Sequence, residues 1–186
     1  DGAGIVMVTD ADSIWDNSEQ LYVGVEGPGT LTIADGGSVE NTDGVLAQFS
    51  RATGTVTVTG PAATWSNSGT LTVGDQGEGT LTIESGGAVE NMDASVGLMP
   101  ELTVSVTVRG SGSSWISNGT LSIGATSPGC GTCGTAQVTV QAGAMVSVTQ
   151  DTALNLDSSL HLEGGALATA QIDLQGGEFL WTGGSL

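Results

Sequence analysis

Apolar residues alternate with threonine or serine in short runs along most of this chain. In the segments "TLTI" at 30–33, "TVTV" at 55–58 and "TLTI" at 80–83, every second side chain is Leu, Val or Ile. Because successive side chains of a β-strand point to opposite faces, the pattern predicts strands with one buried and one solvent face. Gly, Asn, Asp or Pro bounds each run, and no useful stretch has the apolar period of a helix.

These strands belong to an internal repeat. Trp15, Trp65 and Trp115 lie 50 residues apart in matching surroundings, of which "GTVTVTGPAATWSNSGTLTVG" from Gly54 is one example. That segment aligns at an offset of 25 with "GTLTIESGGAVENMDASVG" from Gly79, so each 50-residue unit is a pair of unlike 25-residue coils. The first apolar column of the repeat is Val6/Val8, Leu31/Ile33, Val56/Val58, Leu81/Ile83 and Val106/Val108.

Such a repeat predicts a β-solenoid. A strand of three to five residues cannot bury its apolar face alone, so each coil must stack on a like coil, with parallel strands between coils. We expect an all-β parallel β-helix of about seven coils, each of roughly 25 residues with three short strands. Glycines in "DGG", "SGG", "EGG" and "QGG" are expected at the corners, where a Cβ would obstruct the turn.

The repeat predicts a single domain over residues 1–186. Regular 25-residue coils are expected over 1–133, with a cysteine-containing loop near 125–135, and shorter, less regular coils over 134–186. The chain starts at Asp1 without an initiator Met or an apolar leader. We therefore expect either that a signal peptide has been removed or that the chain is a segment of a larger protein.

Charge narrows the classes of partner. Twenty acidic residues face only Arg51 and Arg109, with no lysine, and the formal charge is −18. A surface of this kind repels nucleic acid phosphates and anionic lipid headgroups, so neither is expected as a partner. No run of 18 apolar residues exists, and we expect no membrane insertion.

The repeat resembles a bacterial sequence type, "VTVTGxxxxWxNSGxLxVGxxGxGTLTIxxGGxVxN", found in autotransporter (type V secretion) passengers and in surface-sorted proteins of Gram-negative bacteria. The resemblance extends from about Gly4 to Gly124. It implies a right-handed parallel β-helix, secreted or displayed on the surface of a Gram-negative cell, with structural or adhesive roles more usual than catalysis. The cysteine-containing insertion departs from this type, and no outer-membrane barrel follows in the chain.

A catalytic function is one alternative, because pectin-cleaving enzymes use the same architecture. Cleavage of an acidic polysaccharide needs a cationic base or clamp and clustered carboxylates. This chain offers only Arg51, Arg109 and His161; the arginines fall at different phases of the coil, and the histidine alternates with leucines on a strand. We therefore do not expect an enzyme.

Two segments of the sequence are candidates for a metal site or a disulfide: the cysteine pair and the acidic residues of the first two coils. Cys130 and Cys133 supply at most half of a zinc site, and in an oxidising setting they are expected to form a disulfide. Acidic residues also crowd the first two coils, at spacings that match neither the EF-hand nor the glycine-rich calcium repeat. These are Asp10, Asp12, Asp16, Glu19, Asp35, Glu40 and Asp43. No cofactor is expected, and calcium is left as an open alternative.

Two columns of the repeat are candidates for ligand binding. If Trp15, Trp65 and Trp115 point outward, they form an aromatic ladder for sugar rings; if inward, they fill corners of the core, which we favour. Outward threonines form arrays resembling those of ice-binding proteins, although Thr is also a good solvent-facing β-former, the interpretation we prefer. The threonines are Thr30/Thr32, Thr55/Thr57/Thr59, Thr80/Thr82 and Thr107, and Met7, Glu84 and Arg109 interrupt their face.

The sequence thus predicts an extracellular structural or adhesive solenoid, such as a fibre subunit, a stalk or a passenger segment. Its expected partners are copies of itself, stacked end to end through unpaired strand edges, and a glycan or cell-surface partner. The alternative is a polysaccharide- or ice-binding module that uses the tryptophan or threonine columns.

Overall fold

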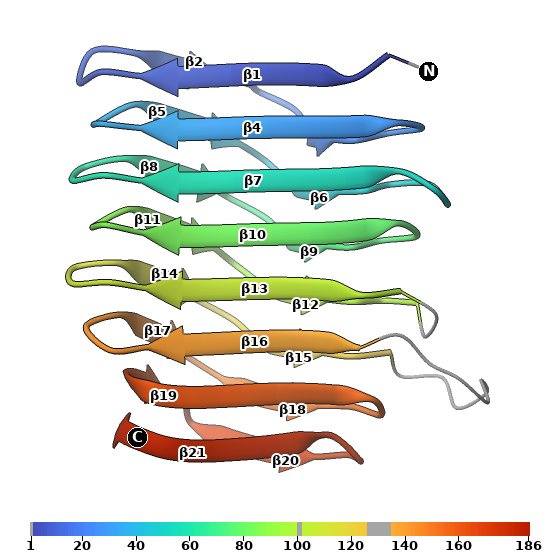
Figure 1. Ribbon diagram of the computed structural model, residues 1–186, viewed down its shortest axis with the longest axis vertical. Helices are drawn as coiled ribbons and strands as arrows, with labels where there is room; N and C mark the ends of the chain where they lie inside the picture. The colour runs from blue at the N-terminus through green and yellow to red at the C-terminus, as the bar shows by residue number, and fades with distance from the viewer. Residues whose placement is uncertain (1, 100–101, 126–134) are drawn as a thin grey trace.

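The chain forms a stack of β-strand coils. The computed structural model describes residues 2–99, 102–125 and 135–186 (Figure 1). All secondary-structure elements within these ranges are β-strands. No helix long and apolar enough to cross a membrane occurs in them. The all-β parallel solenoid expected from the repeat is therefore confirmed.

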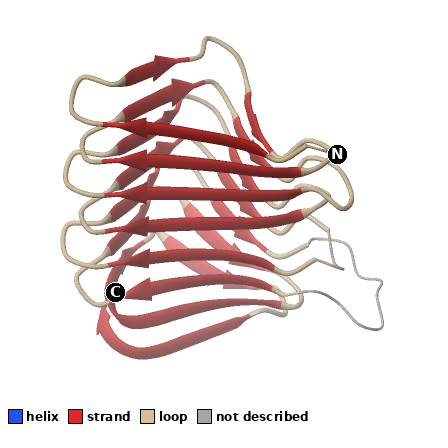
Figure 2. Cartoon of the chain, turned by 45° about the horizontal axis from the view of Figure 1, so that its top comes forward, coloured by secondary structure: helices blue, strands red, loops and turns tan. Residues whose placement is uncertain are grey.

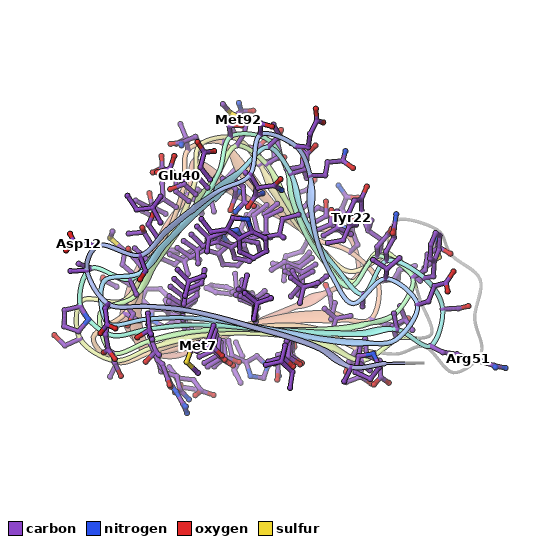
Figure 3. The ribbon with its side chains drawn as sticks, turned by 90° about the horizontal axis from the view of Figure 1, so that it is seen from above. Met7, Asp12, Tyr22, Glu40, Arg51 and Met92 are labelled. Atoms are coloured by element: carbon purple, nitrogen blue, oxygen red, sulfur yellow. The ribbon has the colours of Figure 1, made fainter. Side chains whose placement is uncertain are left out.

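Each coil places one strand on each of three faces, which enclose a triangular cross-section (Figures 2 and 3). The first face contains β1 (Gly4–Thr9), β4 (Pro28–Ala34), β7 (Thr53–Thr59), β10 (Glu78–Glu84), β13 (Val104–Arg109), β16 (Ala136–Gln141), the start of β19 (Ser158–Ala168) and β21 (Glu178–Ser185). The second contains β2 (Ile14–Asp16), β5 (Ser38–Asn41), β8 (Thr64–Asn67), β11 (Ala88–Asn91), β14 (Ser114–Ser117), β17 (Met145–Val148) and the end of β19. The third contains β3 (Leu21–Val23), β6 (Gly44–Leu46), β9 (Leu71–Val73), β12 (Ala94–Val96), β15 (Leu121–Ile123), β18 (Asp151–Leu154) and β20 (Gln171–Leu174).

The described residues make about six turns, slightly fewer than the seven expected. Six coils have three separate strands each, from β1–β3 to β16–β18; β19 then runs across the first and second faces without a break. In Figure 1 the front strands run from right to left as the chain descends, which is a right-handed turn.

Register on the first face follows the repeat. Gly29 pairs with Gly54, and Gly54 pairs with Gly79, a step of 25 residues each time. Val104 pairs with Ala136, a step of 32, and the steps after it are shorter: Ala136 pairs with Ser158, a step of 22, and Ser159 pairs with Glu178, a step of 19. The last coils are therefore smaller than the first.

The core is a set of apolar columns that run along the axis. The exposed fraction is 2% or less for the inward residues of the central first-face strands, and their outward neighbours are half-buried or exposed. The inward residues are Leu31, Ile33, Val56, Val58, Leu81, Ile83, Val106, Val108, Val138 and Val140. Apart from Val6 in the first coil, which is 41% exposed, the first apolar column expected from the repeat lies inside, because alternate side chains of a strand point to opposite sides of the sheet.

Candidate functional site

The tryptophans point into the solenoid on its second face. Trp65 and Trp115 are 0% and 1% exposed, and Trp15 is half-buried against the same core. Trp65 pairs with Val39 and Val89, so large and small side chains alternate along the column. Buried rings cannot stack on a sugar, and the hypothesis of an outward aromatic ladder is wrong for Trp65 and Trp115.

A one-residue shift between alternate coils explains why the repeat alone left this orientation open. The step from Trp65 to Val89 is 24 residues, and the step from Val89 to Trp115 is 26. A uniform offset of 25 would instead align Trp65 with Glu90, which is exposed. The turn between the first and second faces is one residue longer in the tryptophan-containing coils, and that extra residue directs the indole inward.

Buried asparagines partner the indoles. The Nε1 of Trp65 donates to Oδ1 of Asn41 at 2.7 Å, and Nδ2 of Asn41 donates to Oδ1 of Asn67 at 2.7 Å. One 50-residue unit later, Nε1 of Trp115 donates to Oδ1 of Asn91 at 2.7 Å. These asparagines were not among the residues expected at a site, although "VEN" recurs at 39–41 and 89–91 and "WSN" stands at 65–67. They satisfy polar atoms that would otherwise be buried without partners.

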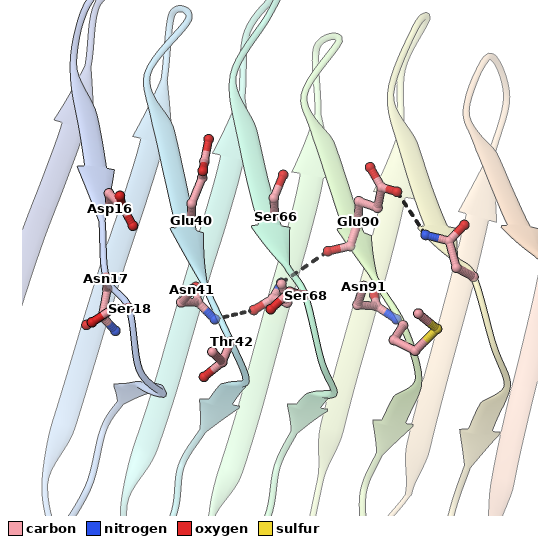
Figure 4. A pocket seen from close by; sticks show the side chains of 13 residues that line it. Asp16, Asn17, Ser18, Glu40, Asn41, Thr42, Ser66, Ser68, Glu90 and Asn91 are labelled. Carbon is pink, nitrogen blue, oxygen red and sulfur yellow. Dashed lines mark hydrogen bonds between the residues drawn. The ribbon is translucent and has the colours of Figure 1, made fainter.

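A shallow groove of about 450 Å³ lies outside the same asparagines (Figure 4). It crosses the first five coils where the second-face strands end. Its lining is Asp16, Asn17, Ser18, Glu40, Asn41, Thr42, Ser66, Asn67, Ser68, Glu90, Asn91, Met92 and Asn118. The groove is polar and carries acidic side chains from three coils.

Carboxylates at this corner also hold the backbone together. Oδ1 of Asp43 accepts a hydrogen bond from the backbone N–H of Thr70 at 2.7 Å, and Oδ1 of Asp93 accepts one from Thr120 at 2.8 Å. On the groove surface, Asn118 donates to Oε1 of Glu90 at 2.8 Å. Part of the acidity that suggested calcium therefore has a structural partner within the chain.

The described residues contain no group of three or more His, Cys, Asp or Glu side chains arranged to hold a metal ion. Cys130 and Cys133, the expected disulfide, lie outside the described residues. Calcium at the first two coils stays an untested alternative.

Cationic side chains do not converge in the part of the chain that the structure describes. Arg109 pairs with Glu84 at 2.6 Å on the first face, and both side chains are partly solvent-exposed. Arg51 is exposed in the turn before β7. His161 is half-buried on β19, with Nδ1 at 3.9 Å from Oε1 of Glu163.

Asp75 is a carboxyl group in a partly buried position. Asp75 lies at the corner between β9 and β10, and burial there raises its pKa above the usual value, because desolvation disfavours the charged form. The desolvated carboxyl group therefore costs the fold stability when it is ionised.

Comparisons with protein-family models, with curated proteins and with solved structures find no match.

Proposed function

We propose that this chain is a structural or adhesive rod outside the cell, of the kind that forms a stalk, a fibre subunit or an autotransporter passenger segment. The observation that carries the proposal is the uninterrupted parallel pairing of one coil with the next on all three faces. Such a stack spaces its ends at a fixed distance, because each coil adds about 4.8 Å along the axis. Catalysis is not part of the proposal.

The acidic surface limits the partners that the proposed rod can bind. With 20 acidic and two basic residues, the chain is electrostatically repelled by nucleic acid and by anionic surfaces. Location at the surface of a Gram-negative cell rests on the resemblance of the repeat to passenger sequences, and a glycan or surface protein is the expected adhesive partner.

Copies of the rod are proposed to stack end to end. Parallel sheets grow by adding strands at an edge, and an added coil would continue the same columns. Sedimentation at neutral pH over a range of concentrations tests this part. Polymers that lengthen with concentration support it, and a single monomer species at every concentration rejects it.

Display outside the cell is tested on native material. Antibody against the purified chain, used in electron microscopy of intact cells, is expected to label rods or fibres at the surface, and protease added to intact cells should remove the label. Labelling confined to permeabilised cells would reject an extracellular role. A matched cytoplasmic marker, protected from the protease, controls for cell integrity.

A further inference from the structure

Threonine is concentrated on the outer side of one face of the solenoid. Eight threonines there form two columns, which we call the threonine array: Thr32, Thr57, Thr82, Thr107 and Thr139 in the first, and Thr30, Thr55 and Thr80 in the second. On the second and third faces, the corresponding outward positions of the described strands hold only Thr64 and Thr72. Since all three faces are solvent-facing β-sheet, β-propensity alone does not explain this difference.

Within the described residues, the hydroxyl groups of the array form no side-chain hydrogen bond. Among the side-chain hydrogen bonds of the described residues, none involves one of these eight threonines. The threonine hydroxyls that do form such bonds belong to Thr64, Thr120, Thr152, Thr169 and Thr182. Ladder hydrogen bonds, the purely structural explanation for a threonine column, are therefore absent here, and the hydroxyls are left to solvent.

The array has a regular geometry. The pairing from β4 to β16 contains no bulge across these positions, so neighbours in a column are about 4.8 Å apart, and neighbours along a strand are about 6.6 Å apart. Seen along the axis, the first-face strands nearly superimpose (Figure 3), and fully buried side chains such as Ile33, Val58 and Ile83 support them from behind. The hydroxyls thus have a fixed and nearly flat arrangement.

This spacing suits ordered water. When hydrogen bonds of about 2.8 Å meet at a tetrahedral oxygen, the two outer oxygens are about 4.6 Å apart, so one water can bridge consecutive hydroxyls of a column. Ice is the extended form of that tetrahedral network. The methyl group of each threonine lies beside its hydroxyl and cannot form hydrogen bonds. It therefore restricts the orientations that the bridging water can adopt.

Charge is absent from the array, although the chain carries −18 overall. The Glu84–Arg109 ion pair lies in the adjacent column, at the margin of the face, and Met7 precedes the first threonine of its column. The interruptions noted in the sequence therefore border the array rather than divide it. We propose that the threonine array binds an ice surface, a function beyond that of a structural rod.

The test measures thermal hysteresis and crystal shape with the purified chain, alone and with single substitutions. Wild type is expected to shape ice crystals and to separate freezing from melting. Thr57→Tyr, in the middle of the array, and Thr82→Lys, one coil further, are expected to abolish both effects. Thr72→Tyr is the matched control on the third face and is expected to keep them. Circular dichroism verifies that each variant is folded.

Three outcomes would overturn the proposal. The first is wild-type protein that leaves crystal shape and freezing unchanged. The second is an equal loss of activity in the folded Thr72→Tyr and Thr57→Tyr variants. The third is adsorption to microcrystalline cellulose without any effect on ice, which would assign the array to a polysaccharide surface instead.

Discussion

At the scale of single residues, the second face depends on polar atoms within an apolar core. Asn91 is 1% exposed, accepts from the indole of Trp115 and donates to Oγ of Ser117 at 3.1 Å. The amide satisfies the only polar atom of the indole and a hydroxyl on the next coil. A tryptophan can therefore occupy an interior position without leaving its N–H unpaired.

Replacement of this amide is expected to be costly. Asn91→Ala leaves the buried indole N–H of Trp115 without its acceptor, whereas the hydroxyl of Ser117 keeps the carbonyls of Met92 and Thr120. The unpaired N–H should lower the free energy of unfolding by about 1–3 kcal/mol. Denaturant unfolding measures the change. Asn118→Ala removes an exposed amide of the same type and is expected to change it by less than about 0.5 kcal/mol. Equal effects of the two substitutions would contradict the proposed role of the buried asparagine.

Asp75 leads to a prediction about pH. Its raised pKa means that the folded chain holds the proton more tightly than the unfolded chain, so stability is lost as the pH rises and the carboxyl ionises. Asp75→Asn should therefore raise Tm relative to wild type at pH 7, and the gain should shrink as the pH falls toward 3.8. Thermal unfolding at several pH values measures it. Asp12→Asn, in an exposed turn, controls for the loss of one negative charge, and an equal gain from both would contradict the argument.

At the scale of elements, the corners between faces decide which coils can stack. Gly79 begins the regular part of β10, and a Cβ added to it would lie 2.4 Å from the backbone nitrogen of Gly74, closer than any real contact. The close approach brings the turn after the third face against the next first-face strand. Glycine is required at this position because a side chain would collide with the neighbouring backbone. The same glycine recurs in the segments "GPGT" and "GEGT".

A methyl group added at Gly79 is expected to push the two backbone segments of this corner apart. Gly79→Ala should lower the free energy of unfolding by about 1–3 kcal/mol, because backbone rather than a flexible side chain must move. Gly4→Ala is the matched control, since a Cβ there has nothing within 4 Å, and it is expected to be neutral within about 0.5 kcal/mol. Chemical denaturation of both variants tests the difference, and a neutral Gly79→Ala would show that the turn has room to adjust.

At the scale of the whole molecule, a narrow rod carries a large excess of negative charge. Only two basic side chains oppose 20 acidic ones, and one of them, Arg109, is paired on the first face. Self-repulsion in such a structure acts along its whole length and is reduced by dissolved salt. The coils stay together because continuous apolar columns outweigh that repulsion.

Salt is therefore expected to stabilise the rod. Raising NaCl from low concentration to 0.5 M should increase Tm by about 2–4 °C, which for a chain of this size corresponds to about 1 kcal/mol. Scanning calorimetry measures the change. CaCl₂ and MgCl₂ at equal ionic strength provide the control: equal effects indicate general screening, whereas a larger rise with Ca²⁺ that EDTA reverses would establish a specific calcium site.

The sequence by itself determined the strands, the 25-residue repeat and the inward position of residues such as Leu31 and Val56, because alternation and periodicity are local properties that stacking preserves. Only the tertiary structure decided which way the tryptophans point. One extra residue in a turn shifts Trp65 from the register of Glu90 to that of Val89, and such a shift reverses the face of a side chain. The buried asparagines and the groove were decided in the same way, since neighbours 24 to 26 residues apart meet only after the coils have stacked.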